Sequence, residues 1–314
     1  MKEGIGVFFK GAAMGAANVI PGVSGGTVAF ITGIYERLIH AVKSVDATAL
    51  KLLLSGKFAD FAKRIDFSFL AALGAGIVVS ILTLASVLKF LFANHEVFVW
   101  AFFFGLILAS VYFVGKKVKH WSAGAAIGFL LGAGIAIGVA LLKPASENDS
   151  IWYLLICGVV AMASMIIPGL SGSFVLLLLG NYQLIMIESV AGLKTLEVDA
   201  FRILIPVGIG AIVGVIALSR LLAWIFDRYH DLAVALLTGF VAGSLLIIWP
   251  WKTAQIEVFE AAGRMKEKVI GYQWYLPEMS GETFLALGIM VLGFLSVWLM
   301  ERLGTVESDD DSAK

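Results

Sequence analysis

The sequence is poor in charge, and its charged residues favour neither sign. Only 15% of the 314 residues are charged while 60% are hydrophobic, whereas soluble domains carry about 25% charged residues. The mean hydropathy is +0.95, and 23 basic residues balance 23 acidic ones. This composition excludes disordered and fibrous chains, and it excludes an overall field that would attract nucleic acid. It predicts an integral membrane protein with no nucleic-acid partner.

Cysteine and catalytic patterns are scarce as well. Cys157 is the single cysteine, so no internal disulfide can form and a disulfide-rich extracellular domain is excluded. The four histidines are scattered without the spacing of metal ligands. No nucleophile with its base, no phosphate-binding loop and no carboxylate pair is visible. We therefore expect no metal, no cofactor and no catalytic residue, and we do not expect an enzyme.

Long uncharged runs are what the sequence has in abundance. The runs that reach about the 20 residues needed to cross a hydrocarbon core as a helix are 67–88, 97–115, 121–142 and 232–251, and 151–187 is uncharged throughout. Several membrane crossings are therefore predicted.

A repeated motif divides the chain into two halves. Asn18–Thr27 (NVIPGVSGGT) returns as Met165–Phe174 (MIIPGLSGSF) at an offset of 147 residues. A second set of matches recurs at an offset of 134: Gly74, Gly76, Phe104-Gly105 and Ser110 against Gly208, Gly210, Thr238-Gly239 and Ser244. We divide the chain into a first membrane repeat, 1–145, a second repeat, 150–304, and an acidic tail, 305–314.

The first element of each half is too long for one crossing. Residues 4–42 exceed one membrane thickness at about 1.5 Å per residue, and Pro21-Gly22 would break the helix at its midpoint. We expect a re-entrant hairpin of two half-helices, repeated at 151–190 with its break at Pro168-Gly169. Non-helical backbone at that depth must be covered by protein or line a water-filled cavity. A cavity near the two breaks is therefore implied.

Three full spans complete each half, at 67–92, 97–115, 121–142, then 201–226, 232–251 and 282–303. An odd number of crossings inverts the second half relative to the first, as in many transporters. The predicted fold is an all-α polytopic membrane protein with two inverted-topology repeats, each a re-entrant helical hairpin plus three transmembrane helices. We expect an interfacial segment at 46–66 and an outer loop at 252–281. Loop charges do not fix the orientation, because hairpins that crossed fully would satisfy the positive-inside bias with the opposite one.

The repeated Pro-Gly-x-Ser-Gly turn can bind an anion without basic side chains. Glycine allows close backbone approach, serine can cap the helix that follows, and a helix start presents N–H groups. The residues expected to hold a phosphate are Asn18, Ser24, Gly25, Gly26 and Thr27 in the first copy, and Ser171, Gly172 and Ser173 in the second. Pro21, Gly22, Pro168 and Gly169 form the breaks. The alternative is that these small residues only permit tight helix packing, but the duplication favours binding.

Arg220 is a further candidate for contact with phosphate. It lies six residues inside the end of the predicted span 201–226, and ionisable residues within membrane segments are costly and usually functional. The alternative is that its long side chain reaches the interface and has no role in binding. The sequence leaves both interpretations open.

These motifs resemble the PopT-type polyprenyl-phosphate transporter family, formerly a domain of unknown function. The resemblance rests on the two turns together with Phe102–Ile107, Thr238–Phe240 and Trp249–Lys252, and it covers nearly the whole chain. It implies a flippase that returns undecaprenyl phosphate, the lipid carrier of peptidoglycan and other envelope synthesis, across the bacterial cytoplasmic membrane, among membrane lipids. Coupling to a proton or a sodium ion fits such a transporter, and no residue identifies the ion.

The chain departs from the family pattern at two places, and two other functions stay open. Leu246–Ile248 stand where relatives often carry a basic pair, and Gln183 stands where the first copy has Glu36. Undecaprenyl-pyrophosphate phosphatases of the BacA type share re-entrant turns, but they carry an arginine after the serine, where this chain has Gly25 and Gly172. A transporter or channel for a small soluble anion could use the same site.

Overall fold

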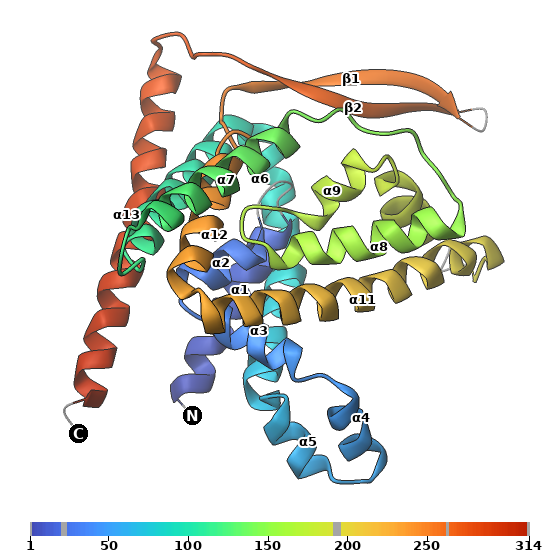
Figure 1. Ribbon diagram of the computed structural model, residues 1–314. Helices are drawn as coiled ribbons and strands as arrows, with labels where there is room; N and C mark the ends of the chain where they lie inside the picture. Colours follow the sequence, from blue (N-terminus) through green and yellow to red (C-terminus); the bar gives the residue numbers. More distant parts are fainter. Residues whose placement is uncertain (1, 20–23, 191–195, 262–263, 313–314) are drawn as a thin grey trace.

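The computed structural model describes residues 2–19, 24–190, 196–261 and 264–312 (Figure 1). The helices in chain order are α1 (Lys2–Val19), α2 (Gly25–Ile31), α3 (Tyr35–Lys43), α4 (Ala47–Leu54), α5 (Phe58–Arg64), α6 (Phe67–Gly115), α7 (Ala123–Ala140), α8 (Ile151–Ile166), α9 (Gly172–Leu178), the π-helical segment η1 (Gln183–Ser189), α11 (Val198–Arg228), α12 (His230–Ser244) and α13 (Gly281–Ser312). Strands β1 (Lys252–Ala261) and β2 (Arg264–Trp274) pair antiparallel.

The described helices make the chain a multi-pass membrane protein, as its composition predicts. Four are long and apolar enough to cross a bilayer: α6 from Phe90 to Gly115, α7, α11, and α13 as far as Leu299. A fifth is added if α5 and the first part of α6, which meet at 70°, form one bent span. Helices α8 and α12 are apolar but shorter.

The second arm of each predicted hairpin is shorter than expected. We expected one helix over 26–42, but α2 ends at Ile31 and the chain turns at Gly33, whose φ of +72° is a left-handed conformation that suits glycine. In the second half Gly180, with φ of +75°, follows α9 in the same way. The predicted break at Pro21-Gly22 lies outside the described residues.

Two predicted spans in the first half are joined, and one in the second is shortened. The spans expected at 67–92 and 97–115 form the single helix α6, bent at His95, where φ is −143° and ψ is 40°. Helix α12 ends at Ser244 instead of residue 251. Turns follow it as far as Pro250, which cannot donate a helical hydrogen bond and restricts the residue before it.

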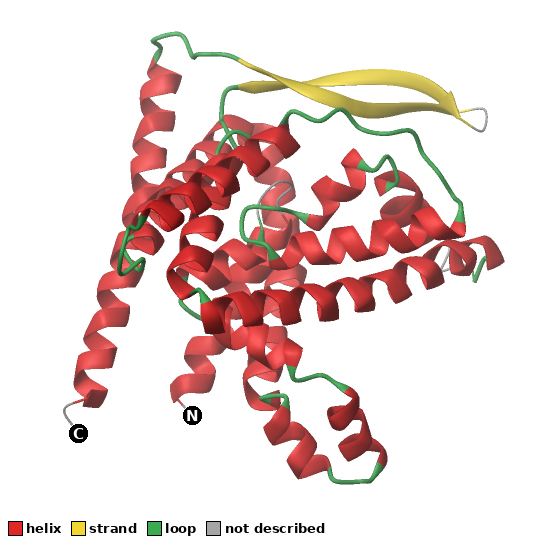
Figure 2. Ribbon diagram, in the orientation of Figure 1, coloured by secondary structure: helices red, strands yellow, loops and turns green. Residues whose placement is uncertain are grey.

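The segment 252–281, expected as an outer loop, contains the β1–β2 hairpin. The hairpin lies along one edge of the helical body, beyond α8 and α9 in the view of Figure 2. Its first strand alternates polar and apolar residues, with Ile256 and Val258 on either side of Glu257, which is the period of two typical of a strand. The prediction considered only the charge of this segment and missed that alternation.

The segment 46–66 folds into the short helices α4 and α5, which project from one end of the molecule (Figure 1). Asp46 accepts a hydrogen bond from the Ala49 amide at 2.9 Å and pairs with Arg64 at 2.6 Å. The hydrogen bond from Arg64 lowers the pKa of the Asp46 carboxyl to about 2. Leu54 at the end of α4 and Phe58 at the start of α5 are largely exposed. This end of the α4–α5 pair therefore presents apolar side chains outward.

Glycines bring the first helix of each half close to its partner. A Cβ at Gly11 or Gly76 would collide with backbone across the contact between α1 and α6, and a Cβ at Gly158 or Gly210 would do so between α8 and α11. The carbonyls that would be struck belong to Leu73, Phe8, Val207 and Leu155, respectively. Every residue of the first contact maps onto the second by the offsets of 147 and 134 found in the sequence.

Two further tight pairs join helices from different halves. Gly105 of α6 lies against the carbonyl of Met290 in α13, and Gly239 of α12 lies against the carbonyl of Phe129 in α7. Gly105 and Gly239 are again separated by 134 residues, and Phe129 and Met290 by 161. The second part of α6 therefore packs with the last helix of the other half, and α12 packs with the last helix of the first half.

Substitution of these packed glycines is expected to destabilise the fold. Gly76→Ala and Gly210→Ala place a methyl group against backbone and should cost about 1–3 kcal/mol, even though alanine favours a helix over glycine by about 1 kcal/mol. Gly74→Ala and Gly208→Ala are matched controls, because nothing lies within 4 Å of a Cβ at either position. Thermal unfolding in detergent measures the difference, and equal melting temperatures within each pair would contradict the packing role.

Candidate functional site

The two repeated turns meet in the interior of the molecule. The Gly169 amide donates a hydrogen bond of 2.7 Å to the hydroxyl of Thr27, and both residues are buried. A Cβ at Gly26 would lie 2.9 Å from the carbonyl oxygens of Met165 and Ile166, at the end of α8. Gly169 has a φ of +89°, which turns the chain from α8 toward α9. The start of α2 thus packs directly against the second turn.

In the described part of the first turn, the amides of Gly25, Gly26 and Thr27 are already bonded. The Asn18 side-chain oxygen accepts from the Gly25 amide at 2.8 Å, and the Ser24 hydroxyl accepts from the Gly26 amide at 3.1 Å. The Thr27 amide donates to the Ser24 carbonyl at 3.0 Å. Ser24, Gly25, Gly26 and Thr27 are buried. In this conformation the protein's own side chains take the positions that we expected an anion to occupy.

The second turn is less fully bonded. The hydroxyls of Ser171 and Ser173 lie 2.7 Å apart and bond to each other, and Ser171 does not cap α9 with its side chain. No hydrogen bond joins the amides of Gly172 or Ser173 to any residue that the structure describes. Met165 stands where the first copy has Asn18, and its apolar side chain cannot accept from an amide as asparagine does. The second turn therefore keeps donors that a ligand could use.

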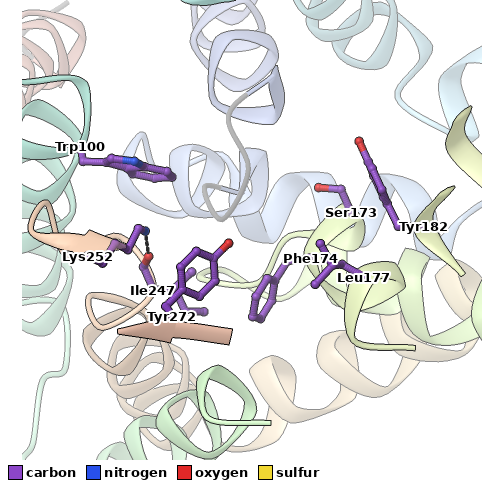
Figure 3. Close-up of a pocket in the computed structure, with 8 residues that line it drawn as sticks. All are labelled: Trp100, Ser173, Phe174, Leu177, Tyr182, Ile247, Lys252 and Tyr272. Carbon is purple, nitrogen blue, oxygen red and sulfur yellow. Dashed lines mark hydrogen bonds between the residues drawn. The ribbon is translucent and has the colours of Figure 1, made fainter. Parts of the chain in front are cut away.

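A cavity of about 120 Å³ opens beside this second turn (Figure 3). Its walls come from helices and from the hairpin: Trp100, Ser173, Phe174, Leu177, Tyr182, Ile247, Lys252 and Tyr272. In Figure 3 the Ser173 hydroxyl points toward the space between α9 and the aromatic side chains opposite. An amine, a hydroxyl and aromatic rings therefore line one cavity.

Lys252 is the basic residue of this cavity. Its ammonium donates to the carbonyl of Ile247, and it lies 3.8 Å from the centre of the Trp100 ring and 5.1 Å from that of Tyr272. Burial lowers the pKa of the Lys252 ammonium to about 7, and the negative charge of Glu96 opposes part of that change. The site thus holds an amine whose protonation changes near neutral pH.

An apolar cavity of about 200 Å³ lies on the next turn of α6. It is lined by Ala13, Ala16, Ala17, Val28, Ile31, Thr32, Phe102, Phe103, Leu106 and Val297. Trp100 of the first cavity and Phe103 of the second are three residues apart, so their side chains are neighbours on one helix face. Helix α6 therefore contributes one aromatic side chain to each of the two cavities.

The described residues predicted for the two turns lie close together in the structure, whereas Arg220 lies apart from them. The residues of the two turns come together around the bond between Thr27 and Gly169. Arg220 is exposed on α11 and does not line the cavity beside the second turn. Lys252 and Trp100 were not predicted as site residues, although Lys252 directly follows the Trp-Pro-Trp motif that carried the family resemblance.

Comparisons with known proteins point to one family. The family model described as undecaprenyl phosphate translocase-like matches residues 14–266. A polyprenyl-phosphate transporter of Vibrio cholerae serotype O1 (strain ATCC 39315 / El Tor Inaba N16961) is 38% identical over 79% of this chain and 78% of its own. One from Staphylococcus aureus (strain NCTC 8325 / PS 47) is 29% identical over 77% of this chain and 84% of its own. No solved structure matches the chain.

The contact between the turns predicts a large effect of a small substitution. Thr27→Val keeps the shape of the side chain but leaves the buried Gly169 amide without an acceptor, which should cost about 1–3 kcal/mol. Thr32→Val is the control, since the Thr32 hydroxyl bonds only to carbonyls of its own helical segment. Melting temperatures in detergent should fall for the first variant and stay close to wild type for the second. Equal values would show that the Thr27 hydroxyl does not hold the turns together.

Proposed function

Because the chain belongs to the undecaprenyl phosphate translocase-like family, we propose that it moves undecaprenyl phosphate across a bacterial cytoplasmic membrane and so returns the lipid carrier for cell-envelope synthesis. The match over residues 14–266 carries this proposal. The relatives from Vibrio cholerae and Staphylococcus aureus bear the name polyprenyl-phosphate transporter. The proposed substrate is therefore an amphiphile with an anionic head and a long apolar tail.

Such a substrate needs help to cross a bilayer. A phosphate monoester carries about −1.5 to −2 charges near pH 7, and an unpaired ion in hydrocarbon costs far more than thermal energy supplies. A site that bonds the phosphate while the tail stays in an apolar environment removes most of that barrier. The cavity beside the second turn, which holds Lys252 and Ser173, suits the anionic head of such a lipid, and the apolar cavity that includes Phe103 of α6 suits its tail.

We place the phosphate at the paired turns. In the second turn Ser173 lines the cavity, and the Ser171 hydroxyl and the amides of Gly172 and Ser173 lie directly behind it at the start of α9. In the first turn Asn18 and Ser24 already bond the amides, so binding there requires the Asn18 side chain to move away from Gly25. The exposed Arg220 is proposed only to attract the headgroup at the surface of α11.

The proposed architecture is a pair of inverted repeats, 1–145 and 150–304. Two observations support it: the glycine contacts of α1 with α6 recur between α8 and α11 at constant offsets, and the last helices of the halves exchange partners reciprocally. Inverted repeats place equivalent turns at one depth, where a substrate can be reached from either side. The helices α4 and α5 are proposed to rest on the anionic headgroup surface through Leu54, Phe58 and neighbouring lysines.

We propose transport without hydrolysis, so this protein is not an enzyme. Hydrolysis of a pyrophosphate requires a base or nucleophile near phosphorus and cations on the leaving group. The predicted residues of the two turns supply hydroxyls, amides and the Asn18 side chain, none of which is a general base near neutral pH. Coupling to a proton or sodium ion stays part of the proposal without an assigned residue.

A leaflet-resolved assay with purified protein in liposomes tests the function. The protein should move labelled undecaprenyl phosphate between leaflets and release no inorganic phosphate from undecaprenyl pyrophosphate. Ser173→Ala should slow transport at limiting substrate about fivefold, since a lost hydrogen bond is worth about 1 kcal/mol. Ser296→Ala is the control, because that hydroxyl bonds within α13. Phosphate release by the wild-type protein would favour the phosphatase instead.

A further inference from the structure

The cavity beside the second turn contains one lysine, Lys252, among its described lining residues. Lys252 has no ion-pair partner among the residues that the structure describes. Its ammonium contacts the Ile247 carbonyl and the rings of Trp100 and Tyr272 (Figure 3). Burying an ammonium is costly unless it is paired and hydrogen-bonded. Two rings and one carbonyl compensate only part of that cost.

The groups around Lys252 compensate its charge only in part. Glu96 is the nearby carboxylate, but its oxygen accepts from the indole N–H of Trp100 at 3.1 Å and makes no ion pair with the lysine. Tyr272 lines the cavity from β2, and burial raises the pKa of its hydroxyl, so it adds no negative charge near the lysine. An ammonium has three N–H donors, and one of them is used by Ile247. Two donors remain for a ligand.

The position of Lys252 is well defined by its neighbours. It begins β1 directly after Trp249-Pro250-Trp251, and Trp251 is buried. The ring of Trp100, itself only 6% exposed, forms one wall of the cavity, and Ser173 projects toward the cavity from α9 on the opposite side (Figure 3). The amine and the hydroxyl thus approach one enclosed volume from two elements that are far apart in sequence.

We propose that Lys252 is the charge partner of the phosphate monoester in the transported lipid, with the Ser173 hydroxyl as a second donor and Trp100 and Tyr272 as the walls of the headgroup site. This inference rests on the proposed function. The cavity of about 120 Å³ takes the headgroup alone, and the tail leaves along the apolar cavity on α6. A pure anchoring role for Lys252, holding the hairpin against α6, is the competing explanation.

Binding to the purified full-length protein in detergent separates the two explanations. Lys252→Met keeps the apolar stem over Trp100 and removes the charge, so affinity for undecaprenyl phosphate should fall about tenfold or more, as expected for a lost hydrogen bond to a charged group. Lys116→Met is the matched control: Lys116 also lies over a ring, that of Tyr112 at 4.3 Å, but outside this cavity. Undecaprenol, which lacks the phosphate, should bind both variants like wild type.

The outcomes distinguish this inference from the proposed function. If the wild-type protein binds undecaprenyl phosphate and Lys252→Met binds it equally well while remaining folded, the headgroup role is wrong and the transport proposal stands. If the wild-type protein binds no undecaprenyl phosphate, the proposed function itself is contradicted. Competition by inorganic phosphate at similar concentration to the lipid would assign the same anion site to free phosphate and overturn the lipid assignment.

Proton uptake when undecaprenyl phosphate binds is a second measurement, and a lysine that only anchors the hairpin would not produce it. Burial lowers the pKa of free Lys252 to about 7, and a bound dianion would raise it by favouring the charged form. Binding at pH 8 should therefore take up close to one proton, measured by calorimetry in buffers of different ionisation enthalpy. Lys252→Arg should still bind but take up none, since arginine stays protonated. Wild-type binding without proton uptake would contradict direct contact between Lys252 and the phosphate.

Discussion

Backbone that leaves a helix inside a membrane must find its hydrogen bonds within the protein, and this constraint shapes the whole molecule. The two repeated turns satisfy it partly through each other, because the Gly169 amide of one donates to the Thr27 hydroxyl of the other. Gly26 allows the approach, since a side chain there would strike the end of α8. The close contact between the two turns follows from this shared solution.

The two copies satisfy the constraint differently because two residues differ. Asn18 closes the first turn by accepting from the Gly25 amide, whereas Met165 at the equivalent position leaves the second turn without that acceptor. Ser173 in place of Gly26 adds a hydroxyl that lines a cavity. One turn is consequently closed on itself and the other keeps donors available. Among the described residues, the duplicated motif therefore leaves unbonded amides at Gly172 and Ser173 in its second copy.

The sequence predicted those helices whose positions depend on local hydrophobic patterns. The predicted spans 121–142 and 201–226 agree with α7 and α11 within a few residues, and the span predicted at 282–303 begins with α13, which continues to Ser312. The breaks at Gly33 and Gly180 were missed because the need for a left-handed φ depends on what packs around the turn. Lys252 was missed for a similar reason: its neighbours Trp100 and Tyr272 are distant in the chain. Arg220, chosen for its place in an apolar run, lies exposed on α11.

The packed glycines also determine which parts can move as units during transport. A simple picture would rock the first half against the second around the turns. However, Gly105 allows the second part of α6 to pack closely against α13, and Gly239 allows α12 to pack closely against α7. Each of these contacts joins a helix of the first half to a helix of the second. Sliding either pair would bring residues with side chains opposite the carbonyls that now face glycine, which close packing disfavours. These contacts therefore favour helix pairs over whole halves as the units that stay together, and the non-helical backbone of His95 separates the part of α6 that packs with α1 from the part that packs with α13.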